Sequence, residues 1–224
     1  MFAIYARENE SPWGAGEGHA ALALETLEAN PFAPLEEMQV DVESPWEPYD
    51  RARALKALAD EKGSVAFRAA RPFPLRASVF RHPLYNLLQL EVADEYLNSK
   101  DAPAASVEFA EKLARALPNF AYGGASADLA VHDFYVSRDM AFLPEPFGYV
   151  GWYHLLAPRG YEPYFEPEDL RGLPAHRVEE RDGGTFAVTS YPNPLAFGDA
   201  PARARIVEMT DYLNERRKDW KEDW

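Results

Sequence analysis

Histidine is the residue type in this chain best suited to acid–base chemistry or metal binding. The five histidines are His19, His82, His132, His154 and His176. No two of them lie four residues apart, so no helix face offers the paired imidazoles of a zinc site. His132 and His154 fall in expected strands, where they could meet beside Asp133 as an acid–base pair. Histidines in strands are more commonly ordinary hydrogen-bonded groups. We expect no metal site, and a hydrolase using these three residues is kept as an alternative.

Motifs for nucleophilic catalysis and phosphate binding are absent. The chain has no cysteine, which excludes disulfides, thiolate ligands and a cysteine nucleophile. It contains neither a Gly-x-Ser-x-Gly elbow nor a Walker loop, and the nearest elbow match, Gly123–Ala127, lacks the second glycine. We therefore expect no catalytic residue, no cofactor and no enzyme activity.

Charge is the most informative feature of the sequence. Lys and Arg total 23 and Asp and Glu total 37, so the net charge is -14, which disfavours binding to nucleic acid. Residues 1–50 hold eleven acidic side chains and one basic residue, Arg7. An acidic segment of this kind predicts a basic protein partner. The residues expected to contact it are Glu36, Glu37, Asp41, Glu43 and two tryptophans of proline-containing loops, Trp13 and Trp46.

The next stretch has the opposite charge. Ser64–Pro83 carries four arginines and no acidic residue, and its prolines predict an irregular segment with short strand fragments. This arginine-rich stretch is the second place where an interface could lie.

The pattern of apolar residues predicts the elements that position these side chains. Strands are expected at Phe2–Ala6, Leu35–Val42, Leu87–Ala93, Leu129–Val136 and, as a long central strand, Phe147–Leu156. A hairpin is expected over Val178–Thr189, because Gly183 and Gly184 suit a tight turn with positive φ. With about four helices, the pattern predicts one α+β domain over residues 1–224, with a mainly antiparallel or mixed sheet. Segments 1–32 and 88–120 share an order of elements that a weak duplication would explain.

The last expected helix begins near Asp199 and could extend to the C-terminus. It would carry Trp220 and Trp224 on one apolar stripe, so an assembly protein or a homodimer that associates through this helix is a further alternative. No apolar run approaches the ~20 residues of a membrane helix, and the first residues do not form a signal peptide. We expect a cytoplasmic protein that does not bind membranes.

The C-terminal third resembles bacterial immunity proteins. The residues concerned are Gly151-Trp152-Tyr153, Leu155-Leu156, Asp182-Gly183-Gly184-Thr185 and a closing helix with Ala204, Glu208 and Leu213. This pattern is similar to immunity protein family 52 of polymorphic toxin systems and, next, to the type VI immunity family. The resemblance implies an α+β cytoplasmic protein that neutralises a toxin of its own cell, often a nuclease. The motif residues Gly151, Trp152, Gly183, Gly184 and Thr185 look structural, so the resemblance assigns no toxin contact.

Overall fold

The protein is described from a computed structural model of residues 1–224. The structure describes residues 2–9, 17–41, 43–59, 64–82, 85–126, 128–138, 140, 143 and 148–218. The chain divides into two compact units, Met1–Phe120 (unit 1) and Ala121–Trp224 (unit 2). A single domain over the whole chain stays a prediction.

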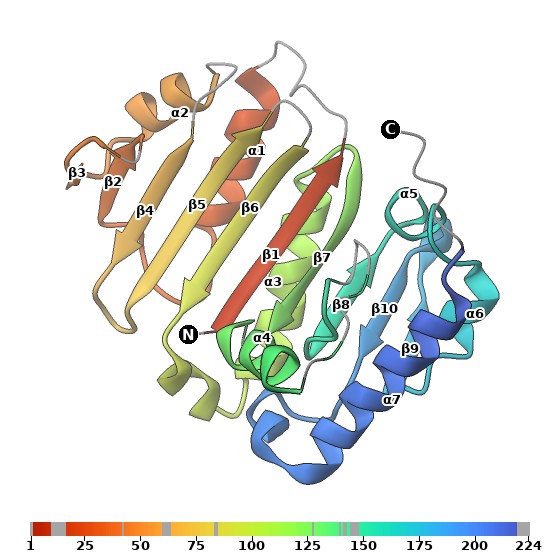
Figure 1. The fold of residues 1–224 in the computed structure, drawn as a ribbon. Coiled ribbons are helices and arrows are strands. Elements are labelled where there is room, and N and C mark those ends of the chain that lie inside the picture. Colours follow the sequence, from red (N-terminus) through yellow and green to blue (C-terminus); the bar gives the residue numbers. More distant parts are fainter. Residues whose placement is uncertain are drawn as a thin grey trace. The chain divides into compact units, whose positions relative to one another are not determined.

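Unit 1 is built on antiparallel strands in the spatial order β3-β2-β4-β5-β6-β1. The strands are β1 (Phe2–Asn9), β2 (Glu37–Val40), β3 (Glu47–Pro48), β4 (Val65–Ala69), β5 (Leu75–His82) and β6 (Tyr85–Val92). The helices are α1 (Glu17–Glu28), α2 (Arg51–Ala59) and α3 (Ala102–Arg115), with a 3₁₀ turn at Asp94–Asn98. Figure 1 shows α1 and α3 behind this sheet.

Alternation along the strands of unit 1 separates a core face from an open face. In β6, Leu88 and Leu90 are fully buried, whereas the intervening Gln89 is only partly buried. The core face packs on aromatic residues from the connecting segments. The ring of Phe32 meets those of Tyr96 and Phe109 edge to face, at 4.7 and 5.6 Å between centroids. In the described part of unit 1, no helix covers the open face in Figure 1.

Unit 2 contains short antiparallel strands in the order β7-β8-β10-β9. The strands are β7 (Phe120–Ser126, of which Phe120 is the last residue of unit 1), β8 (Tyr153–Leu156), β9 (Arg177–Glu180) and β10 (Phe186–Thr189). The helices are α4 (Asp128–Ser137), α5 (Pro158–Tyr161), α6 (Pro167–Arg171) and α7 (Ala200–Arg216), with 3₁₀ turns at Asp182–Gly184 and Pro194–Gly198. The hydroxyls of Tyr135 on α4 and Thr210 on α7 share a buried hydrogen bond, which joins these two helices.

The structure confirms the α+β class and the antiparallel sheet, but it corrects three expectations. The described residues form seven α-helices instead of about four. Leu129–Val136 is helical, and its buried residues Val131, Phe134 and Tyr135 have the three- and four-residue spacing of a helix face. The arginine-rich stretch is more regular than expected, because its short strand fragments are parts of the longer strands β4 and β5, both of which lie within it.

The expected long central strand is also wrong. Only Tyr153–Leu156 of Phe147–Leu156 is a strand, β8. Before it, Gly148 has a φ of 55°, and the ring of His154 accepts a hydrogen bond from the Gly151 amide at 2.8 Å. These contacts hold a buried bend, and a wholly apolar sequence cannot distinguish a buried bend from a buried strand.

The hairpin and the start of the last helix are found where the sequence predicts them. Strands β9 and β10 pair antiparallel, with φ of 72° at Gly183 and 74° at Gly184 in the turn. Helix α7 ends at Arg216, and the amide of Lys218 then donates to the Tyr164 carbonyl at 2.8 Å. The expected stripe of Trp220 and Trp224 lies outside the described residues.

Candidate functional site

Most of the residues expected to contact a partner lie together at one edge of unit 1. Glu36 and Glu37 stand at the start of β2, Asp41 and Glu43 follow its end, and Trp46 precedes β3. Trp13 lies outside the described residues.

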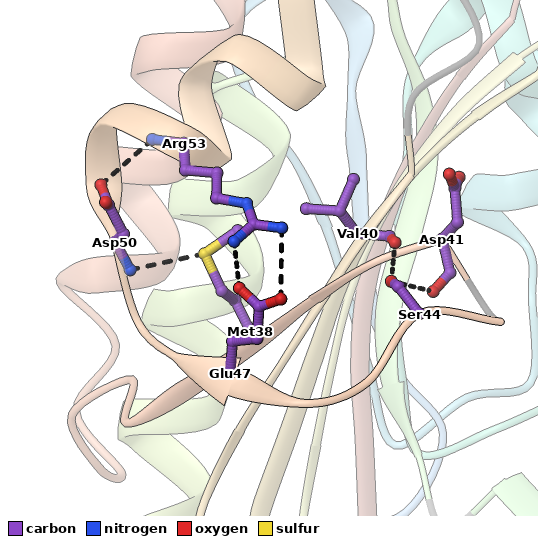
Figure 2. Close-up of polar contacts among 7 residues, drawn as sticks. All are labelled: Met38, Val40, Asp41, Ser44, Glu47, Asp50 and Arg53. Carbon is purple, nitrogen blue, oxygen red and sulfur yellow. Dashed lines mark hydrogen bonds and ion pairs between the residues drawn. The ribbon is translucent and has the colours of Figure 1, made fainter.

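The segment between β2 and β3 forms a compact turn. Asp41 adopts a left-handed backbone with a φ of 69°, which aspartate tolerates better than most residues. The Ser44 hydroxyl donates to the carbonyls of Val40 and Asp41, and the Ser44 amide donates to the Asp41 carbonyl at 3.2 Å. Figure 2 shows the Asp41 carboxylate pointing away from these contacts. The side chains of Asp41 and Glu43 are exposed, and neither forms an ion pair within the described residues.

Most other carboxylates of the acidic segment have partners in the fold. Glu37 pairs with Arg68, Glu47 with Arg53, and Glu25 and Glu28 with Arg51. Figure 2 shows the Glu47–Arg53 pair below helix α2, whose first turn is capped by Asp50.

Two further carboxylates of this segment bind polar groups of the protein. Glu36 accepts from the Ala70 amide at 2.9 Å. Glu8 is fully buried and accepts from the Asn86 side chain at 2.6 Å and the Asn119 amide at 3.0 Å. Ion pairs thus offset several of the charges of this segment. Among its described residues, Asp41 and Glu43 are exposed carboxylates without an ion pair, whereas the exposed Glu36 and Asp50 accept hydrogen bonds from backbone amides.

Trp46 lies partly buried at the border of the open sheet face. The Arg68 guanidinium stands 4.4 Å from its ring centroid, at cation–π distance. Beside it is a shallow hollow of ≈ 360 Å³. The hollow is lined by Gln39, Trp46, Ala66, Phe67, Arg76, Ala77, Ser78, Gln89 and Glu91.

A row of charged residues crosses the open face beside this hollow. The strand registers place Glu37 opposite Arg68, Arg68 opposite Arg76, and Arg76 opposite Glu91. Arg76 is exposed and has no ion pair in the described part of the chain. Sequence reasoning missed this row because short strand fragments in an otherwise irregular stretch do not show that Arg68 and Arg76 lie opposite each other on paired strands. The alternation of Arg68 with the apolar residues Phe67 and Ala69 is typical of a strand, and it could have indicated that Arg68 lies on the open face.

The three residues of the hydrolase alternative lie in different environments of unit 2. The His132 and Asp133 side chains on α4 are 52% and 82% exposed, with 3.7 Å between the His132 Nδ1 and an Asp133 carboxylate oxygen. His154 is 2% exposed, and burial lowers its pKa to about 4. Its Nε2 accepts from the Gly151 amide, so this ring supports the bend before β8. A buried ring and two exposed side chains do not form one acid–base site.

The motif residues behind the family resemblance serve packing and turns. Trp152 is 3% exposed, and its indole N–H donates to the Tyr191 carbonyl at 2.9 Å. A Cβ on Gly151 would lie 2.7 Å from the Ser126 hydroxyl, so that position accepts no side chain without movement. Thr185 follows the hairpin turn, where its carbonyl accepts from the Arg181 amide at 2.7 Å.

No group of three or more His, Cys, Asp or Glu side chains in the described residues is arranged to hold a metal ion. None of the helices formed by the described residues is long and apolar enough to span a membrane.

Comparison with solved structures finds a similar fold in the T6SS protein PA0821 of Pseudomonas aeruginosa. The TM-score is 0.60 at 15% sequence identity, and the match covers 96% of this chain and 73% of that chain. No protein-family model and no curated protein matches the chain. At this identity the likeness establishes the fold alone: the chain shares the architecture of a T6SS protein.

Proposed function

We propose that this protein is an immunity protein that binds and neutralises a cognate secreted toxin. The toxin is of a nuclease type, and the acidic segment between β2 and β3 blocks its basic substrate groove. The observation that carries this proposal is the pair of exposed carboxylates, Asp41 and Glu43, on a turn held by Ser44. The fold shared with a protein named for the type VI secretion system (T6SS) is consistent with that role.

The physical argument concerns the charge of a nuclease groove. A nuclease presents lysines and arginines to the phosphates of its substrate, so carboxylates placed at the same points can occupy its groove. Long-range attraction then raises the association rate above the ~10⁵ to 10⁶ M⁻¹s⁻¹ of a neutral pair, and salt lowers it again. A turn fixed by its own hydrogen bonds loses little conformational entropy on binding.

The ion pairs of this edge narrow the choice of residues to test. Replacing Glu37 would also release Arg68, so its effect on binding would mix lost attraction with a new free cation. Asp41 and Glu43 have no such partners in the described residues. They are the cleanest test of the proposal, and Trp46 supplies an aromatic contact beside them.

The experiment measures association with the toxin by stopped-flow. The toxin is sought as the product of a neighbouring gene that co-purifies with this protein. The double variant Asp41→Lys/Glu43→Lys is expected to slow association at least about tenfold at low salt, with a smaller effect at high salt. The matched control is Glu162→Lys/Asp211→Lys, which reverses two exposed carboxylates of unit 2 without ion pairs in the described residues.

Each result has a clear reading. Slowing by the first variant and not by the control supports a site at the β2–β3 turn. Equal slowing by both variants would indicate net charge alone. An association rate insensitive to both variants and to salt would contradict the electrostatic account and direct the search to the open sheet face around Arg76.

A further inference from the structure

A second hollow lies in unit 2, between α4 and the first turns of α7. It has a volume of ≈ 310 Å³, within the range of small-ligand sites. Its lining residues are Phe134, Arg138, Gly198, Ala200, Arg203, Ala204 and Val207. Two of these described residues are arginines and none of them is acidic, in a protein whose net charge is -14.

Aromatic rings hold the two guanidinium groups. The Arg138 guanidinium lies 5.5 Å from the Phe134 ring centroid, and that of Arg203 lies 5.6 Å from the centroids of both Phe134 and Phe197. The two rings meet edge to face at 5.9 Å. The Arg203 Nε–H also donates to the Phe197 carbonyl at 3.3 Å. A guanidinium placed against a ring keeps its N–H edge available while its orientation is restricted.

Neither arginine of this hollow forms an ion pair within the described residues. Some other arginines of the unit do form ion pairs: Arg171 pairs with Glu168 and Glu180, and Arg205 with Glu208. Asp199 stands four residues before Arg203, yet its carboxylate is exposed and makes no ion pair with that arginine. Within the described residues, the two guanidiniums beside the Phe134 ring therefore have no ionic counter-charge.

We propose that the Arg138–Arg203 hollow binds an oxyanion group, either a carboxylate or a phosphate. The planar fork of each guanidinium donates two parallel N–H bonds to such a group, and Phe134 supplies an apolar floor between them. This site lies in unit 2 and is independent of the proposed toxin contact at the β2–β3 turn. Loss of one function therefore leaves the other testable.

The test is an NMR titration of the full chain with inorganic pyrophosphate and with succinate, at constant ionic strength. Saturable shifts are expected at the amides of Ala200, Ala204 and Val207, which line the hollow. Arg138→Gln and Arg203→Gln are each expected to weaken binding about tenfold, because each removes charge-assisted hydrogen bonds. The probe that binds more tightly identifies the oxyanion as phosphate or carboxylate.

Arg217→Gln is the matched control. Arg217 is exposed, has no ion pair in the described residues, and lies fourteen residues along the chain from Arg203, about 20 Å at the rise of a helix. Unchanged affinity in this variant shows that the hollow is responsible. Arg138→Lys and Arg203→Lys keep the charge but lose the fork, and they are expected to bind more weakly than the native protein.

The proposal is overturned by either of two results. One is shifts that rise linearly with both probes and never saturate. The other is saturable binding that survives in Arg138→Gln/Arg203→Gln as strongly as in Arg217→Gln. Circular dichroism of each variant confirms that the fold is intact, and the single lysine variants decide the matter if the double variant unfolds.

Discussion

The open sheet face of unit 1 and the strands β8 and β10 of unit 2 follow opposite rules of packing. On the open face every second residue meets water, as the partly buried Gln39, Ser78 and Gln89 show. In β8 all four residues are buried, as are three of the four in β10. Polar or charged groups can therefore vary on the open face at little cost in stability. Unit 2 tolerates few changes at its strands.

Trp152 and Trp46, the two tryptophans whose surroundings the structure describes, give the test of this comparison with the largest expected effect on stability. Trp152→Ala is expected to lower the free energy of unfolding by ~3 to 5 kcal/mol, because it empties a buried site and removes the bond to the Tyr191 carbonyl. Trp46→Ala is expected to cost about 1 kcal/mol or less, since that ring is partly exposed against Arg68. Chemical denaturation measures both. Equal losses would show that the two regions do not differ as described.

The buried histidine of unit 2 gives a pH-dependent test. The pKa of His154 is about 4 in the folded protein against 6.5 for the free group, so the unfolded chain takes up a proton first as pH falls. Stability is then present above pH 6.5 and is lost as pH falls toward 4. Between pH 6.5 and 5 the expected loss is roughly 1.5 kcal/mol.

Substituting His154 isolates its contribution to the pH dependence of stability. Denaturation of His154→Gln should show a flatter pH dependence in that window than the native protein, whatever its stability at pH 7. His132→Gln, which changes an exposed ring on α4, should retain the native slope. A native slope in both variants would mean that another group causes the pH dependence.

The hairpin turn gives an effect of similar size. Gly184→Val is expected to destabilise the protein by ~1 to 3 kcal/mol, because a β-branched residue is strained at a φ of 74°. Its Cβ would also lie 3.3 Å from the Pro158 side chain. Gly198→Val is the control, since a Cβ there meets nothing within 4 Å and the backbone is not left-handed. A melting temperature unaffected by Gly184→Val would contradict the turn.

The charged row of unit 1 gives the smallest effect. Glu37→Gln should cost about 0 to 1 kcal/mol, because the Glu37 and Arg68 side chains are 41% and 43% exposed and water screens their attraction. A double-mutant cycle with Arg68→Gln measures the coupling by thermal denaturation. Coupling well above 1 kcal/mol would show that this open face contributes to stability as the strands of unit 2 do.

Particular residues show how far the sequence could predict this structure. The alternation of Leu88 and Leu90 with Gln89 gave β6, and the adjacent Gly183 and Gly184 gave the hairpin, because both patterns are local. Residues 129–136 were misassigned although Val131, Phe134 and Tyr135 had helical spacing. The mixed polar and apolar residues between them also suited a strand.

The sequence predicted that several acidic residues lie near Trp46, but it did not predict which of them form ion pairs. The sequence alone placed the acidic residues beside Trp46 and a short strand, since neighbours along an extended segment stay neighbours in the fold. It could not show that Arg68 would neutralise Glu37 or that Arg51 would bind Glu25 and Glu28, because these pairs join residues more than twenty positions apart.

Local sequence thus determined alternating strands such as β6, the glycine turn and the overall negative charge, each of which depends on neighbouring residues or on composition. Tertiary structure alone decided which charges remain unpaired. It left Asp41 and Glu43 free of ion pairs in the described residues, and it brought Arg138 and Arg203 to one phenylalanine ring across sixty-five positions of chain. The physical reason is that an ion pair or a stacked ring depends on distances of a few ångströms in space, which separation along the sequence does not specify.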